Sequence, residues 1–238
     1  MTRFRTMLLA SVVMSVAAAS AAQAALSVSG SVGGAPTGVV LDNLNWLSLG
    51  TAGGLSPQSG ITVTFSGGGR AVQGSVSGQY AAPFLSGGNG SGFGNPIGTN
   101  QPNGVDLTTY ATTAAGGSSV RIDLPTNGGL GYLYFGLLWG SVDSYNTLSF
   151  FSGNTLIGSI TGSNVTASPN GNQGVNGTLY VNVTSTVAFD RVVATSSQFA
   201  FEFDNIAFNQ TVPVPAPAAL GLFGVGLLGL AFARRRRA

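Results

Sequence analysis

The chain has 238 residues, of which only 7% are charged, and it contains no His, Cys or Lys. This composition excludes Ser-His-Asp and Cys-His catalysis, imidazole or thiolate metal sites, Schiff bases and Walker-type phosphate loops. Residues 25–212 hold three arginines against seven acidic residues, a net charge of −4, so they lack the clustered basic side chains that nucleic-acid binding requires.

The first 24 residues have the pattern of a secretory signal peptide. Arg3 and Arg5 precede an apolar stretch over residues 7–19, and Ala22 and Ala24 supply the small residues that signal peptidase needs. An uncleaved N-terminal anchor is the alternative, but the apolar stretch is short and rich in alanine for that role. We therefore expect export across the inner membrane and cleavage after Ala24.

Residues 25–210 form the predicted secreted domain, and strand signals dominate it. Residues 61–65 and 120–124 alternate strictly between apolar and polar side chains, and residues 131–140 are typical of a long buried strand. Residues 146–161 predict a hairpin that turns at a Ser-Gly-Asn sequence. With glycine-rich turns and no convincing interior helix, the pattern predicts an all-β fold, an antiparallel β-sandwich of jelly-roll type.

Two stretches of this domain, residues 85–104 and 162–177, predict long loops rich in Gly, Asn and Ser. Loops of this length inside a compact domain are usually functional or mobile. Their composition favours backbone turns over side-chain chemistry. We expect mobility, with ligand contact as the alternative.

Any hydrolytic chemistry in this chain would have to rest on carboxylates alone. Glu202 and Asp204 lie two residues apart, so in a strand they share one face at a separation of ~7 Å, which overlaps the spacing of paired glycosidase carboxylates. The structural interpretation is that Phe199, Phe201 and Phe203 fill the core while the two acids face water. Contact with Ca²⁺ or a sugar, and catalysis, remain the alternatives.

Asp143 and Asn146 are the next candidates. A tight turn explains both, because Asx side chains bond to nearby backbone N–H groups, and Ca²⁺ coordination by their oxygens is the alternative. Trp139 and the nearby tyrosines could stack on sugar rings, but their apolar surroundings favour core packing. We expect no catalytic residue and no cofactor, with Ca²⁺ held by Asp143, Asn146, Glu202 or Asp204 as the weaker hypothesis.

Residues 211–238 have three parts: a proline spacer, an uncharged apolar run over 218–233, and a terminal arginine cluster. A helix of the length of that run spans roughly 24 Å, short of the ~30 Å hydrocarbon core, but snorkelling arginines make the span workable. The positive-inside bias keeps the arginines cytoplasmic. The stretch predicts a transmembrane helix, followed by the membrane stop Arg234, Arg235, Arg236 and Arg237.

The order of these parts resembles the PEP-CTERM sorting signal of exosortase-dependent bacterial surface proteins, a tail also labelled an ice-binding protein C-terminal domain. The residues that carry the motif are Val214, Pro215, Ala216, Pro217 and Ala218. Ala216 stands where the usual motif has glutamate. The resemblance implies removal of the helix by an exosortase and transfer of the mature protein to the cell surface or its release.

Residues 134–148 are similar to a family of exosortase-dependent surface proteins that share a Phe-Gly-x-x-Trp-Gly-Ser-x-Asp-x-Tyr-Asn core. The resemblance does not identify a molecular activity. We expect a non-enzymatic protein, first anchored in the inner membrane and then at the cell surface, in the outer membrane or outside the cell. We expect its partners there to be extracellular polysaccharide or biofilm matrix. A Ca²⁺-dependent lectin-like module and a carboxylate-based glycan-active enzyme are the alternatives.

Overall fold

The computed structural model describes residues 26–31, 33–126 and 128–213. Its regular elements are strands apart from one four-residue helix, α1 (Gly162–Val165), so the all-β prediction is confirmed for this part of the chain. All strand pairs in the two large sheets are antiparallel. The predicted signal peptide and transmembrane helix lie outside the described residues.

The two large sheets contain seven and six strands. The first sheet, sheet A, runs in the order β1 (Leu26–Ser31), β13 (Leu179–Phe189), β10 (Tyr132–Gly140), β15 (Glu202–Asn209), β8 (Tyr110–Thr112) and β5 (Arg70–Val72), with β2 (Val40–Asp42) also pairing with β15. The second, sheet B, runs in the order β12 (Thr155–Thr161), β11 (Asn146–Ser152), β14 (Arg191–Ser196), β9 (Ser119–Asp123), β4 (Thr62–Ser66) and β3 (Gly54–Leu55). A separate short pair joins β6 (Phe84–Leu85) and β7 (Gly104–Val105).

Aromatic side chains of the two sheets meet in one hydrophobic core. Phe135 of β10 contacts Phe150 of β11 edge to face with ring centroids 6.1 Å apart, and Phe150 also contacts Phe189 of β13 at 5.2 Å. Trp139 is fully buried and stacks on Phe201 at 4.2 Å. The prediction that the central aromatic run packs in the core is therefore confirmed for Trp139.

Sheet B follows the half-buried pattern that its sequence predicts, whereas sheet A is covered on both faces. Strand β14 alternates between buried and partly exposed residues along its length. In contrast, β10 and β15 are buried at nearly every position. One face of sheet A packs on sheet B in the main core. The loop over residues 85–104 covers its outer face, where Leu85 and Phe93 pack with side chains of β10 and β13. These side chains are Tyr134, Leu138 and Tyr180.

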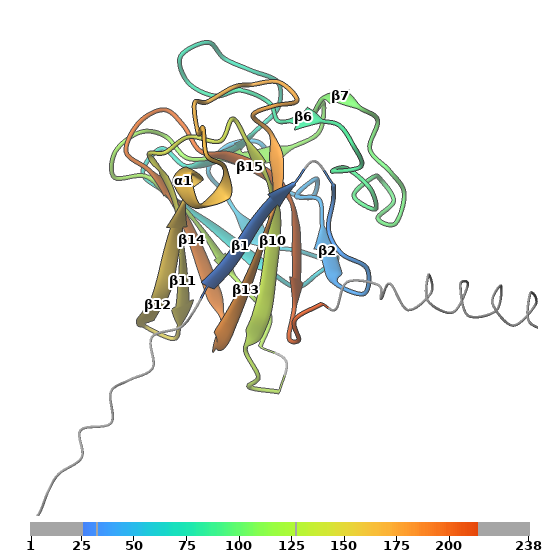
Figure 1. The fold of residues 1–238 in the computed structure, drawn as a ribbon, viewed down its shortest axis with the longest axis vertical. Helices are drawn as coiled ribbons and strands as arrows, with labels where there is room; N and C mark the ends of the chain where they lie inside the picture. Colours follow the sequence, from blue (N-terminus) through green and yellow to red (C-terminus); the bar gives the residue numbers. More distant parts are fainter. Residues whose placement is uncertain (1–25, 32, 127, 214–238) are drawn as a thin grey trace, which may run out of the picture.

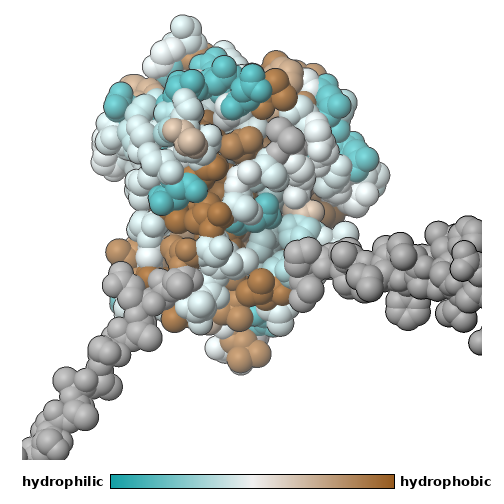
Figure 2. Space-filling view, viewed as in Figure 1, coloured by the Kyte–Doolittle hydropathy of each residue, from teal (hydrophilic) through white to brown (hydrophobic). Residues whose placement is uncertain are grey.

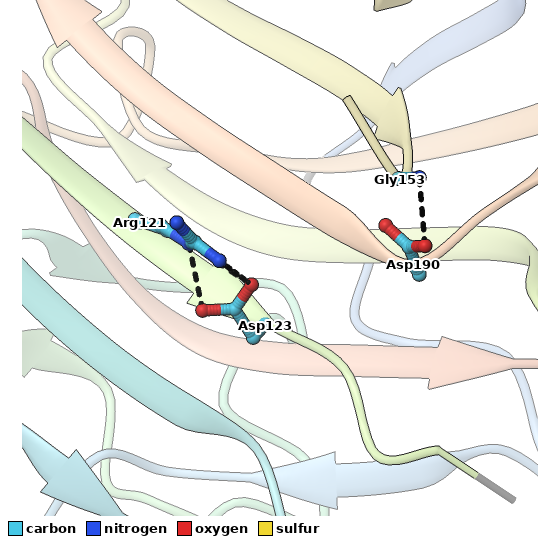
Figure 3. A network of polar contacts seen from close by, with 4 residues as sticks. All are labelled: Arg121, Asp123, Gly153 and Asp190. Atoms are coloured by element: carbon cyan, nitrogen blue, oxygen red, sulfur yellow. Dashed lines mark hydrogen bonds and ion pairs between the residues drawn. The ribbon is translucent and has the colours of Figure 1, made fainter. Parts of the chain in front are cut away.

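The hairpin between β11 and β12 is confirmed. Gly153 in its turn has φ +56°, the left-handed conformation that glycine adopts without strain. The Gly153 N–H donates a 2.8 Å hydrogen bond to Asp190, which lies between β13 and β14 (Figure 3). The turn is thus tied to a neighbouring loop of the fold.

The expectation that Glu202 and Asp204 face water is wrong. Their exposed fractions are 2% and 0%, whereas Phe199, expected in the core, is 49% exposed. Phe201 and Phe203 do fill the core, so the alternation along the strand is as predicted. The error arises because long loops cover the outer face of sheet A, and alternation cannot reveal what covers a face.

Within the described residues, no helix has the length and apolar character needed to span a bilayer. The loops that follow β5, β10, α1 and β14 gather at one end of the sheets, the upper end in Figure 1. In Figure 2 that end of the visible face is largely hydrophilic or neutral in hydropathy, while apolar side chains gather lower down. This loop end brings together segments that are far apart in the sequence.

Candidate functional site

The acidic residues of the domain divide into structural and candidate groups. Asp123 forms a surface ion pair with Arg121 at 2.7 Å, and Asp190 holds the hairpin turn described above (Figure 3). Asp42 is saturated, because four hydrogen-bond donors reach its carboxylate: Leu44 N–H, the Trp46 indole N–H, and the hydroxyls of Ser56 and Ser59. Asp106, Asp143, Glu202 and Asp204 are left as candidates.

A pocket of about 480 Å³ opens among the gathered loops and contains two of these acids, Glu202 and Asp143. Its wall combines aromatic side chains, Tyr80 and Tyr145, with polar groups that include the amide of Gln173. Four separate loop segments contribute to this wall, and the sheets position all of them. Sequence reasoning treated Glu202 and Asp143 as unrelated candidates, and the structure brings them to one site.

Glu202 begins β15 and lies at the floor of the pocket, where both of its carboxylate oxygens are hydrogen-bonded. The Ala81 N–H donates to one oxygen at 3.0 Å, and the Ser141 hydroxyl donates to the other at 2.8 Å. Burial raises the pKa of Glu202 to about 7, against the opposing effect of these two hydrogen bonds. The side chain therefore changes charge near neutral pH.

Asp143 lies in the turn after β10, as predicted, and its carboxylate lines the same pocket. Burial raises the pKa of Asp143, while the nearby Tyr145 hydroxyl lowers it. The negative charge of Asp143 contributes to the raised pKa of Glu202. The pocket thus holds two interacting carboxyl groups beside aromatic and amide side chains, a chemistry suited to hydroxyl-rich ligands.

The predicted partner of Asp143, Asn146, does not reach the pocket wall. Its amide nitrogen donates to the Ala200 carbonyl at 3.1 Å, and its amide oxygen accepts from the Ser196 hydroxyl at 2.6 Å. Both ends of the side chain are therefore used in holding β11 beside the segment that leads into β15. The structure does not support joint Ca²⁺ coordination by Asp143 and Asn146.

Asp204 is likewise separated from Glu202, although both lie on one face of β15. Asp204 is fully buried, and burial together with the charge of Asp106 raises its pKa well above the usual range. The proposed carboxylate pair is therefore split between the pocket and a second, buried cluster. Sequence reasoning missed Asp106, whose loop position gave no strand pattern from which to place it.

Over the described residues, no three or more His, Cys, Asp or Glu side chains gather in a way that could hold a metal ion. A metal site in this part of the chain would have to draw on amide or backbone oxygens as well as carboxylates.

The predicted sorting tail and membrane stop lie almost wholly beyond the described residues, which end at Pro213. The family described as the PEP-CTERM protein-sorting motif matches residues 213–237. The chain carries a PEP-CTERM sorting motif at these residues. The motif assigns it to exosortase-dependent sorting, export and targeting to the cell surface. Ala216 remains a departure from the usual glutamate within the matched region.

The match covers the PEP-CTERM tail and says nothing about the β domain that precedes it. Comparison with curated proteins and with solved structures found no match to this chain. The function of the β domain must therefore be argued from its own residues.

We predict that signal peptidase removes the N-terminal end of this protein and that an exosortase removes the C-terminal end. Intact-mass analysis of the protein recovered from the cell surface should give a chain that begins at Ala25 and ends close to Pro217. A host strain that lacks exosortase is the control, and there the C-terminal residues should be retained. Recovery of surface protein that still carries Arg234–Arg237 would contradict the expected cleavage.

Proposed function

We propose that the protein is a non-enzymatic surface protein whose β domain binds extracellular polysaccharide through the Glu202–Asp143 pocket. The observation that carries the proposal is the composition of that wall: two carboxyl groups, two tyrosines and amide side chains at one loop end. Sugars present hydroxyls to polar groups and apolar ring faces to aromatic side chains, so this mixture suits them.

We also propose that the domain is a jelly-roll β-sandwich, a fold that occurs in lectin domains. The strand order supports this: the last eight strands give β8-β15-β10-β13 in sheet A and β9-β14-β11-β12 in sheet B. This interleaving is the arrangement expected of two Greek keys wound together. In such a fold the loops at one end are free to form a binding site while the sheets remain rigid.

Two further candidates concern the same pocket. A glycan-active enzyme is favoured by one observation, the pKa of about 7 at Glu202 beside a second carboxyl group. The hydrogen bonds to both Glu202 oxygens argue for a structural role instead, since they hold the carboxylate within the pocket floor. A Ca²⁺-dependent lectin would use Asp143, with the sugar hydroxyls completing the coordination of the ion.

Polysaccharide binding tests the proposal directly. Purified full-length chain in detergent should bind exopolysaccharide from the producing bacterium, and Gln173→Ala and Tyr145→Ala should each weaken binding about tenfold, the effect of losing roughly 1.4 kcal/mol. Gln58→Ala is the matched control, because Gln58 is exposed on a loop that does not line the pocket.

The alternatives give different results in the same assay. Release of reducing sugar that Glu202→Gln abolishes would replace the proposal by the enzyme, and binding lost on addition of EDTA and with Asp143→Asn would favour the Ca²⁺-dependent lectin. Equal binding by the Gln173 and Gln58 variants would place the ligand outside this pocket.

A further inference from the structure

A second cluster of oxygen atoms lies buried beside β15, away from the pocket wall. Both carboxylate oxygens of Asp204, the Oδ2 atom of Asp106 and the amide oxygen of Asn205 are buried without a hydrogen-bond partner. All three residues have an exposed fraction of 0%. Buried polar atoms in folded proteins almost always have partners, so four unpartnered acceptors in three residues require an explanation.

A hydrogen-bond network joins two of these side chains, Asp106 and Asn205, and Asp204 lies within side-chain hydrogen-bonding reach of Asp106. The Thr108 hydroxyl donates to Asp106 Oδ1 at 2.6 Å, and the Gln101 amide donates to that hydroxyl at 3.2 Å. The same Gln101 side chain accepts a hydrogen bond from the Asn205 amide nitrogen. These bonds occupy one end of Asp106 and of Asn205, and they leave the opposite oxygens free.

The strand pairing along one side of β15 is interrupted at this position. On one side of β15, β8 pairs with Glu202 and Phe203, and β2 pairs from Ile206 onward. Asp204 and Asn205 lie between these two pairings, where no strand of the described residues pairs with β15 on that side. The register with β10 also shifts here, and Asn205 has φ +53°, a local irregularity of the kind that re-aims side chains.

We propose that these unpartnered oxygens form a Ca²⁺ site, with Asp106, Asp204 and the amide oxygen of Asn205 as protein ligands. All four free atoms are hard oxygen acceptors, which suit Ca²⁺, and the two carboxylates balance its charge. Six to eight oxygens surround Ca²⁺ in proteins, so water or backbone carbonyl oxygens would complete the shell. The nearby charge of Asp42 adds to the negative potential at Asp204.

The proposed Ca²⁺ site has a structural role, which differs from the polysaccharide binding proposed for the Glu202–Asp143 pocket. The ion would join two parts of the chain: the residues between β7 and β8, which supply Asp106, and the centre of β15, which supplies Asp204 and Asn205. It would fasten the loop cover onto the outer face of sheet A. An ion bound only by the folded state stabilises that state, and extracellular Ca²⁺ modules bind with Kd values of about 10⁻⁴–10⁻³ M.

The proposal is tested with Ca²⁺ and full-length chain, purified in detergent and stripped with EDTA. Addition of 10 mM Ca²⁺ should raise the melting temperature by about 5–10 °C, and Mg²⁺ at the same concentration should raise it less. Equilibrium dialysis should find one bound Ca²⁺ per chain. Asp204→Asn and Asp106→Asn should each lose most of the Ca²⁺-induced rise, while Asp123→Asn, which removes an exposed carboxylate, should keep it.

The EDTA-treated proteins give a second readout that simple misfolding would not produce. Without Ca²⁺, Asp204→Asn should melt at the wild-type temperature or above it, because the substitution removes a buried carboxylate facing Asp106. With Ca²⁺, the same variant should melt below the wild type. Absence of Ca²⁺ binding by the wild type would overturn the proposal and favour a proton shared between the two carboxyl groups. A Ca²⁺ response that Asp143→Asn removes and Asp204→Asn keeps would overturn it by placing the ion in the pocket.

Discussion

Phe201→Ala is expected to lower the free energy of unfolding by about 3–5 kcal/mol, the usual cost of truncating a buried phenylalanine. Phe201 has no exposed surface and contacts both Trp139, at 4.2 Å, and Phe203, at 5.5 Å. Removal of its ring leaves a cavity between two aromatic neighbours that belong to different strands of sheet A. Guanidinium unfolding followed by tryptophan fluorescence measures the loss, and Trp139 reports directly on the site.

Phe199→Ala is the matched control for this prediction. Phe199 has the same side chain two residues earlier, but 49% of its surface is exposed, so its truncation should cost less than about 1 kcal/mol. Similar losses for the two variants would contradict the packing described here. A domain with a stability of about 5–15 kcal/mol should survive the Phe199 change, whereas the Phe201 change would bring a domain at the low end of that range close to unfolding.

Strands of the domain could be predicted from local pattern because one face of each packs on a common core. The alternation in residues 120–124 and the turn at Gly153 each specify a local conformation without reference to the rest of the chain. Residues 71–80 show the limit of this reasoning. Apolar and polar side chains alternate only weakly along them; strand β5 ends at Val72, and residues 75–80 form part of the pocket wall.

The candidate sites were harder to predict because they depend on contacts between distant segments. The positions of Glu202 and Asp204 on one face of β15 followed from the sequence, but their burial did not, since segments more than ninety residues away cover them. The Ala81 N–H that binds Glu202 is 121 residues distant, and the Gln101 amide that binds Asn205 is 104 residues distant. Local periodicity carries no information about such pairings.

Charge also has a different meaning in the two terminal segments than in the β domain between them. Six of the nine arginines lie in the predicted signal peptide and the sorting tail, so the basic overall charge describes the export and sorting segments. The β domain uses its acidic residues in four ways: to hold turns, to form a surface ion pair, to line a pocket and to form the buried cluster at β15. A protein with few charges thus places most of its acids where they are buried.

Stability of the wild-type protein is expected to fall as the pH rises from about 4.5 to about 7, in part through Glu202. Its pKa is raised by burial from 4.5 to about 7, so the folded state binds a proton that the unfolded state has released in this range. Stability from this proton is fully present below pH 4.5 and is lost as the pH passes 7. The difference is worth about 3 kcal/mol at most.

Glu202→Gln isolates this contribution, because glutamine has nearly the same shape and does not titrate. Unfolding free energies of both proteins should be measured from pH 4 to pH 8 in EDTA, and the difference between the two curves should change by about 3 kcal/mol in favour of the variant as the pH rises. Asp143 and Asp204 titrate in the same direction, and their shared contribution largely cancels in that difference. Parallel curves for the two proteins would mean that the pKa of Glu202 is the same in the folded and unfolded states, because the hydrogen bonds from Ala81 and Ser141 offset the effect of burial.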